Sequence, residues 1–338
     1  MVPSKSNTNG HYPPRLVYSS EEGALFQGDC VELLNQMVTN SVDMAFVDPP
    51  FNLGKDYETE SFTDSLADER YRNWCRTWLL QLIRVLRPGG TLLLYHWPKW
   101  LIDLGAYLNS VPSMKYGSWI AVNMKAGFPI RNRLHPAHYG ILYYTKVGGP
   151  STFNVVRYKA PVCRHCGKEL RDYGGYRGKF KKYEDDDGIP WVQISDFWQD
   201  TRPARQDKSR KVQITELPLH IPERLVLMAS NPGDVILDVF GGSGSTFHAC
   251  QLHSRRWIGC EIGEVTAIMQ RLRTVFGLAD GIVVGTEIGK CFKPTFIKKE
   301  VAAFVDEDRI SVVKAVEPFK EVPRSFNEDG SKSKVLGF

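Results

Sequence analysis

Residues 235–246 read Val-Ile-Leu-Asp-Val-Phe-Gly-Gly-Ser-Gly-Ser-Thr. An apolar run that leads into clustered glycines is typical of a buried strand that turns sharply into a helix. Glycine serves where a backbone turns tightly and where a ligand approaches without a Cβ in its way. The Phe-x-Gly-x-Gly spacing differs from the Gly-x-Gly-x-x-Gly of dinucleotide-binding folds. The stretch therefore predicts an α/β fold that seats a nucleotide-like cofactor on this turn.

The next apolar run, residues 257–262, carries Glu261 close to its end. A carboxylate at the tip of the strand after a glycine turn can accept hydrogen bonds from both ribose hydroxyls of an adenosine moiety. The alternative is an ordinary tight turn beside an exposed glutamate. Glycines and glutamate together favour the cofactor site.

Strand-like and helix-like segments alternate over the first 147 residues and again after the middle of the chain, as in parallel α/β sheets. The predicted strands are residues 42–47, 91–95, 119–124, 139–145, 234–240 and 257–262. The predicted helices are residues 31–37, 71–86, 217–230, 245–252 and 266–276. This order predicts one α/β domain interrupted by an insertion.

A second informative turn, Asp48-Pro49-Pro50-Phe51, follows the predicted strand 42–47. Two prolines fix φ and remove two backbone donors, and Pro50 holds Pro49 in an extended conformation. We expect a rigid tip that presents the Asp48 carboxylate, the Pro49 carbonyl and the Phe51 ring. The carboxylate and the carbonyl can accept hydrogen bonds from the two hydrogens of an NH2 group while the ring stacks on a nucleic-acid base. A base in a duplex must first be flipped out of the stack. The alternative is a purely structural Pro-Pro turn.

The basic charge of the chain is concentrated in one segment. The net charge is +5, and residues 157–211 hold 14 Lys and Arg against 9 Asp and Glu. Such a segment suits a polyanionic partner, and a solvated loop is the alternative. The candidate phosphate contacts are Arg202, Arg205, Lys208, Arg210 and Lys211.

At 338 residues the chain exceeds a typical single domain, and it has no stretch of 18 apolar residues that would span a membrane. The N-terminus lacks the apolar core of a secretory signal. Seven scattered cysteines suggest reduced thiols, and we expect a cytoplasmic protein. The expected segments are a flexible N-terminus (1–20), a catalytic half (21–149), a target-recognition insertion (150–211), a cofactor-binding half (212–279) and a C-terminal appendage (280–338).

The two turns and their flanks resemble a known family. VDPPFNLGKDY, HYGILYYTK and the stretch ELPLHIPERLVLMASNPGDVILDVFGGSGST are similar to the β-group DNA amino-methyltransferases, which modify adenine N6 or cytosine N4. The resemblance covers roughly residues 22–147 and 190–276. It implies a seven-stranded Rossmann-like sheet with one reversed strand, S-adenosyl-L-methionine as cofactor and double-stranded DNA as partner. It also implies a bacterial or phage origin, close to the nucleoid, in restriction-modification, where homodimers are common.

By this resemblance Asp48, Pro49, Pro50 and Phe51 form the catalytic tetrapeptide. The expected cofactor-binding residues are Asp29, Asp238, Phe240, Gly242, Gly244, Ser245, Thr246 and Glu261. Val239 stands where the family usually has proline, and Phe51 replaces the commoner tyrosine. His138-Tyr139 lies where a His-Glu pair is frequent in the family, so tyrosine stands in place of the acid near the flipped base.

Aspartate at the first position of the tetrapeptide favours adenine N6 in this family, and cytosine N4 is the alternative. Two other classes stay open: a non-catalytic DNA-binding protein that has kept the fold, and a methyltransferase that acts on RNA or protein. A cytosine-C5 enzyme is disfavoured because the chain has no Pro-Cys dipeptide to supply its thiolate nucleophile.

Cys163-Arg-His-Cys166 has the spacing of half a zinc site. A structural zinc ion needs four ligands, and no second Cys-x-x-Cys follows. The sequence therefore favours an unligated pair and predicts no metal site. A zinc site completed by another subunit is the alternative.

Overall fold

The computed structural model describes residues 2–3, 12–53, 62–63, 65–123, 131–132, 134, 136–160, 191–198 and 217–276, with scattered positions between 162 and 188. The predicted DNA contacts Arg202, Arg205, Lys208, Arg210 and Lys211 lie outside the described residues, as does the C-terminal segment 280–338. No helix in the described part of the chain is long and apolar enough to cross a membrane.

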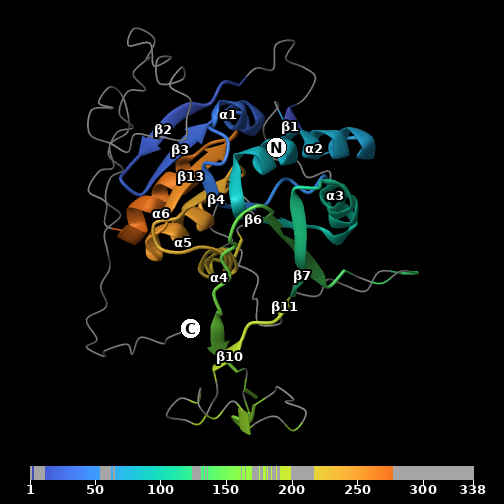
Figure 1. The fold of residues 1–338 in the computed structure, drawn as a ribbon, viewed down its shortest axis with the longest axis vertical. Helices are drawn as coiled ribbons and strands as arrows, with labels where there is room; N and C mark the ends of the chain where they lie inside the picture. The colour runs from blue at the N-terminus through green and yellow to red at the C-terminus, as the bar shows by residue number, and fades with distance from the viewer. Residues whose placement is uncertain are drawn as a thin grey trace.

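A nine-stranded sheet forms the centre of the molecule (Figure 1). Its strands, in spatial order, are β11 (Phe197–Trp198), β7 (Met114–Asn123), β8 (His138–Lys146), β6 (Leu86–His96), β4 (Val42–Val47), β12 (Val235–Asp238), β13 (Arg256–Glu261), β3 (Gly23–Gln27) and β2 (Arg15–Ser19). The seven strands from β7 to β3 are parallel except β8, which runs antiparallel to both neighbours. The predicted Rossmann-like sheet with one reversed strand is thus confirmed, and β11 and β2 extend its two edges.

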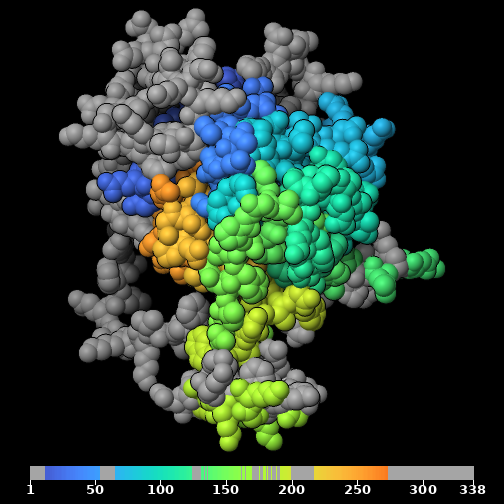
Figure 2. Space-filling model, viewed as in Figure 1, coloured from blue at the N-terminus to red at the C-terminus, as the bar shows by residue number. Residues whose placement is uncertain are grey.

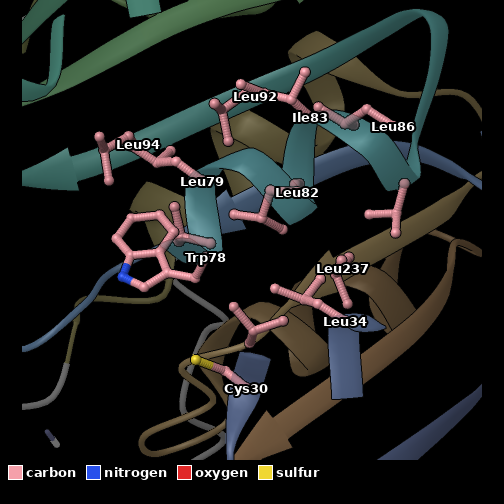
Figure 3. Packing of buried hydrophobic residues seen from close by; sticks show 14 of the residues in the cluster. Cys30, Leu34, Trp78, Leu79, Leu82, Ile83, Leu86, Leu92, Leu94 and Leu237 are labelled. Atoms are coloured by element: carbon pink, nitrogen blue, oxygen red, sulfur yellow. The ribbon is translucent and has the colours of Figure 1, made fainter. Parts of the chain in front are cut away.

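In the described part of the chain, three helices cover each face of the sheet. The first layer holds α1 (Cys30–Gln36), α2 (Asp68–Val85) and α3 (Pro98–Ser110), and the second holds α4 (His220–Ala229), α5 (Ser245–Leu252) and α6 (Thr266–Phe276). Strand side chains alternate between the layers, so Leu92 and Leu94 of β6 pack with α2 (Figure 3) while Leu93 faces the other cluster. Two apolar cores, one on each face, fix the sheet.

The largest departure from the predicted elements lies between residues 86 and 110. The sequence predicts that a helix ends at residue 86 and that a strand follows at residues 91–95, with no helix between that strand and the one at residues 119–124. Instead, β6 begins at Leu86 directly after α2, and helix α3 follows with Pro98 in its first turn. Gly105 lies in the middle of α3, where a Cβ would come within 3.3 Å of Leu142 on β8. The glycine that weakens the helical pattern is therefore what lets the helix approach the sheet.

The insertion forms a small two-stranded sheet of its own and adds one strand to the edge of the central sheet. Strand β9 (Arg157–Lys159) pairs with β10 (Trp191–Gln193), and β11 lies parallel to β7. Trp198 is buried in the second core, and the Arg224 guanidinium of α4 lies over its ring at 5.4 Å. A further two-residue pairing joins β1 (Val2–Pro3) to β5 (Phe62–Thr63).

Candidate active site

Five strands end at the same edge of the sheet and bring the predicted site residues together. Strands β6, β4, β12, β13 and β3 are parallel neighbours, so their carboxyl ends coincide. Asp48 follows β4, Asp238 ends the adjacent β12, and Glu261 ends β13. Asp29 follows β3 at the same edge. Such an edge is where α/β sheets bind their ligands.

The glycine turn joins β12 to α5 in a left-handed conformation. Gly242 has φ +51° and Gly244 has φ +80°, a region that residues with a Cβ rarely adopt. A Cβ on Gly244 would come within 3.0 Å of Ile268, whereas the nearest atom to a Cβ on Gly242 is the Phe240 carbonyl oxygen at 3.8 Å. Gly244 is therefore required by the packing of α6. Gly242 instead borders open space, as expected of a backbone that a ligand approaches.

Glu261 holds the glycine turn with both of its carboxylate oxygens. Oε2 accepts a hydrogen bond from the Gly242 amide and Oε1 accepts one from the Gly263 amide, each at 2.8 Å. Each carboxylate oxygen has a second lone pair, so these bonds leave acceptor capacity for ligand hydroxyls. The predicted ribose contact of Glu261 fits this geometry and stays a prediction.

Asp238 is a buried carboxylate below the glycine turn. It is 3% exposed, and its Oδ1 accepts the Phe240 amide at 2.9 Å. Burial raises its pKa from 3.8 to about 6, against the opposing effect of hydrogen bonds from the Thr246 side chain and the Phe240 backbone. Asp238 and Thr246 thus stabilise the turn through hydrogen bonds inside the protein. Direct contact of either residue with a cofactor stays a prediction.

The remaining predicted cofactor residues flank this turn. Asp29 caps α1, since its Oδ1 accepts hydrogen bonds from the amides of Val31 and Glu32. The Phe240 ring packs edge-on against Trp78 of α2, with centroids 5.3 Å apart. Helix α5 begins at Ser245, and its N-cap residue Gly244 has no side chain to accept hydrogen bonds from the first-turn amides. These amides point toward the glycine turn and can bind a carboxylate.

The Asp-Pro-Pro-Phe turn carries an aromatic cluster. The Phe51 ring lies 5.5 Å from the Tyr139 ring, 6.0 Å from the Tyr95 ring and 4.8 Å from the His96 ring. Burial raises the pKa of both tyrosines, and the negative charge of Asp48 raises it further. The Asp48 carboxylate therefore lies close enough to both tyrosines to act on them electrostatically.

Hydrogen bonds from the first helical layer hold this turn. The Tyr71 hydroxyl of α2 donates to the Pro50 carbonyl, and the Trp100 indole of α3 donates to the Phe51 carbonyl at 2.9 Å. Pro49, which precedes these two residues, is itself buried. The turn is thus anchored through its last two carbonyls.

His96 completes the anchor, and its environment fixes its protonation. Burial lowers its pKa to about 3, so the ring is neutral near pH 7. The Trp97 amide donates to its Nδ1 at 2.7 Å, which assigns the remaining ring proton to Nε2. Nε2 then donates to the Tyr71 oxygen at 2.7 Å, and the Tyr71 hydroxyl donates a hydrogen bond to the Pro50 carbonyl. A chain of three oriented donors ends on the acidic turn.

The sequence did not identify Tyr71, Tyr95, His96, Trp100 or Tyr139 as site residues. Tyr95 and His96 end a strand beside the predicted catalytic strand, a position that could have signalled them. Tyr71 and Trp100 reach the turn from helices, and the amphipathic pattern presents them only as core residues. Tyr139, which stands where the resembling family often has glutamate, contributes an aromatic ring to the site in place of an acid.

Comparisons with known proteins bear on the same residues. The model of the family described as DNA methylase, which covers N6 and N4 methyltransferases, matches residues 42–269. The type II methyltransferase M.BamHI of Bacillus amyloliquefaciens is 43% identical over 256 residues, which make up 76% of this chain and 58% of that protein. M.HpaI of Haemophilus parainfluenzae is 30% identical over 260 residues, 76% of each chain.

Among solved structures, PvuII DNA methyltransferase, named as cytosine-N4-specific, aligns with a TM-score of 0.55 at 16% identity. The alignment covers 77% of this chain and 89% of that one. At this identity the likeness concerns the fold alone.

Proposed function

Since this chain belongs to the DNA methylase family of N6 and N4 methyltransferases, we propose that it methylates the exocyclic N6 amine of an adenine flipped out of duplex DNA, with S-adenosyl-L-methionine as the methyl donor. The observation that carries the proposal is the shared edge of two neighbouring strands. Strands β4 and β12 pair in parallel, so the acidic turn and the glycine turn open onto one side of the sheet. The chain spans 58% of the length of M.BamHI, and the activity is therefore proposed for this chain on its own residues.

The acidic turn would bind the amine. The Asp48 carboxylate and the Pro49 carbonyl accept its two hydrogens, which draws the nitrogen lone pair out of conjugation with the base. The anchored carbonyls of Pro50 and Phe51 keep these acceptors in place, so little reorganisation is needed when the base arrives. The Phe51 and Tyr139 rings offer stacking surfaces for the flipped base.

The glycine turn fits S-adenosyl-L-methionine. The open space at Gly242 admits close approach, the first-turn amides of α5 suit the amino-acid carboxylate, and Glu261 keeps lone pairs for the ribose hydroxyls. When bound, this cofactor supplies an electrophilic methyl group on sulfur. The protein's part is to hold the acceptor nitrogen in line with it.

The choice of adenine rests on Asp48, because aspartate at this position favours adenine in the resembling family. Cytosine N4 is the second candidate, because the PvuII enzyme with the same fold is named as cytosine-N4-specific. Both bases present an NH2 group beside a ring nitrogen, so the two acceptors alone do not separate them.

One experiment tests activity and base together. Duplex DNA methylated by the purified protein is digested to nucleosides and analysed by mass spectrometry, with Asp48→Ala as the inactive control. We expect N6-methyladenine that depends on Asp48. N4-methylcytosine would replace the adenine assignment with the alternative, and no methylated base in any duplex would refute the proposal.

A further inference from the structure

A buried tyrosine beside the acidic turn has a hydroxyl group that no protein group engages. Tyr95 is 5% exposed, and no hydrogen bond joins its hydroxyl to any residue that the structure describes. The buried tyrosines of the other apolar core, Tyr71 and Tyr144, both donate hydrogen bonds to oxygen atoms of the protein. A buried tyrosine usually finds such a partner, because an unmade hydrogen bond inside a protein is costly. The Tyr95 hydroxyl is therefore available to a ligand.

The register of two neighbouring strands places Tyr95 beside Asp48. Strands β4 and β6 run parallel, and Val47 pairs with Leu94. Asp48 and Tyr95 are the next residues along the two strands, so they follow this pair side by side. Val47 and Leu94 both pack in the first core, and strand alternation directs Tyr95 to the second core on the opposite face. The electrostatic effect of Asp48 on Tyr95 agrees with this placement.

The two rings that offer stacking surfaces for a base also surround Tyr95. Its ring centroid lies 6.0 Å from that of Phe51 and 5.2 Å from that of Tyr139. Phe51 and Tyr139 are themselves 5.5 Å apart, so the three rings form one cluster. A base that stacks on this cluster with its amine at Asp48 brings the ring atoms next to the amine toward Tyr95.

The chemistry of the proposed substrate requires a hydrogen-bond donor at this place. Adenine and cytosine each carry, beside the NH2 group, a ring nitrogen that accepts a hydrogen bond and that loses its Watson–Crick partner when the base is flipped out. The Asp48 carboxylate and the Pro49 carbonyl are acceptors and cannot bond to it. The Tyr95 hydroxyl can donate. Burial raises the pKa of Tyr95, and the charge of Asp48 raises it further, so the hydroxyl keeps its proton near pH 7.

We propose that the Tyr95 hydroxyl donates a hydrogen bond to the ring nitrogen beside the target amine, which is N1 of adenine or N3 of cytosine. The inference rests on the proposed methyl transfer and adds a base-binding residue from β6 to it. The bond attaches the base at its ring as well as at its NH2 group, so the base cannot pivot about the amine. The acceptor nitrogen is then held in the position that methyl transfer requires.

Tyr95→Phe tests the proposal, because it removes the hydroxyl and keeps the ring. The methylated position is first located by sequencing the modified DNA. Single-turnover rates are then measured on two duplexes, one with adenine at that position and one with 1-deazaadenine, in which a C–H group replaces N1. On the adenine duplex the variant should be about tenfold slower than wild type. On the 1-deazaadenine duplex this difference should disappear, since neither protein can make the bond. If the methylated base is cytosine, 3-deazacytosine takes the place of the adenine analogue.

The matched control is Tyr143→Phe, which removes the hydroxyl of another buried tyrosine in the same core as Tyr95. It should methylate the adenine duplex at the wild-type rate. The described residues between β9 and β10 lie at the foot of the molecule, away from the two cores of the sheet (Figures 1 and 2). Tyr95→Phe should therefore modify the same DNA sites as wild type. Urea unfolding should show no loss of stability in Tyr95→Phe, because the hydroxyl that it removes has no protein partner.

The possible failures of this test are distinguishable. If Tyr95→Phe keeps the wild-type rate on adenine, or loses the same factor on both duplexes, the hydroxyl does not contact the ring nitrogen, and the proposed methyl transfer still stands. If the wild-type protein methylates no duplex at all, the proposed function is wrong and this inference fails with it.

Discussion

The acidic turn after β4 and the glycine turn after β12 lie at one edge of the sheet but are held by different means. Distant side chains fix the acidic turn, since Tyr71 lies 21 positions and Trp100 49 positions from the carbonyls that they bind. The glycine turn is held by Asp238 and Glu261, which end its own strand and the next one. The acidic turn therefore depends on side chains from two helices, whereas the glycine turn depends on its own left-handed glycines and on carboxylates at the ends of two neighbouring strands.

This difference predicts how each turn responds to substitution. The acidic turn should lose function through changes in helices that touch no substrate. The glycine turn should be sensitive mainly within its own few residues and at the two carboxylates that hold it. Four substitutions test this contrast, from the largest expected effect to the smallest.

Asp48→Ala should have the largest effect, because it removes the charged acceptor of the proposed site. We expect the methyl-transfer rate to fall about 10²–10³-fold, or about 2.7–4 kcal/mol, with unchanged cofactor affinity. Single-turnover kinetics and calorimetry measure the two quantities. The control is Asp103→Ala, which removes a carboxylate paired with Arg72 on the helical layer. An equal loss in both variants would deny Asp48 a specific role.

The same contrast explains what the sequence could and could not predict. The glycine turn, the strand before it and Glu261 were predictable because their signals are local: left-handed glycines and an apolar run. The Asp-Pro-Pro-Phe turn was predictable because its two prolines are also a local signal. Its anchors were not, because Tyr71 and Trp100 belong to helices whose spacing indicates only burial.

Helix α3 was missed although Trp100, Leu101, Leu104 and Leu108 have helical spacing and are all buried. Gly105 weakened the pattern, although Pro98 in the first turn is a favourable helix start. Only the distance to Leu142 in the folded molecule explains the glycine. The edge strand β11 has two residues, too few for any periodicity to reveal.

Asp238→Asn tests whether the buried Asp238 carboxylate, when ionised, destabilises the folded protein. The folded-state pKa of about 6 exceeds the ordinary 3.8, so the folded protein binds this proton more tightly than the unfolded chain. The wild type should therefore lose stability as the pH rises from about 4 to 6, by up to about 3 kcal/mol.

Asparagine does not titrate, and its oxygen can still accept the Phe240 amide. The stability of the variant relative to wild type should thus increase between pH 4 and pH 7. Urea unfolding at the two pH values measures this difference. A difference that is the same at both would show that Asp238 does not titrate as described.

Gly242→Ala separates cofactor contact from backbone strain. Left-handed backbone costs a residue with a Cβ about 1–2 kcal/mol, and Gly233, with φ +86° and open space, would incur a similar cost. Both alanine variants should lose similar stability. Only Gly242→Ala should weaken cofactor binding, by about tenfold or about 1.4 kcal/mol, as measured by calorimetry. Equal cofactor affinities in the two variants would show that Gly242 is not part of the cofactor site.

Tyr71→Phe tests the anchoring of the acidic turn through a residue that we do not expect to touch substrate. It leaves the Pro50 carbonyl and the His96 Nε2–H without their shared partner, which costs about 1–3 kcal/mol of stability. Tyr144→Phe is the matched control. This buried tyrosine of β8 packs in the same apolar core as Tyr71, and it donates to the Asn109 side chain of α3 at 2.8 Å, away from the turn. We expect both to reduce stability, and only Tyr71→Phe to slow methyl transfer, by about tenfold at saturating DNA and cofactor. If both variants keep the wild-type rate, the anchors serve folding alone and the acidic turn is as self-contained as the glycine turn.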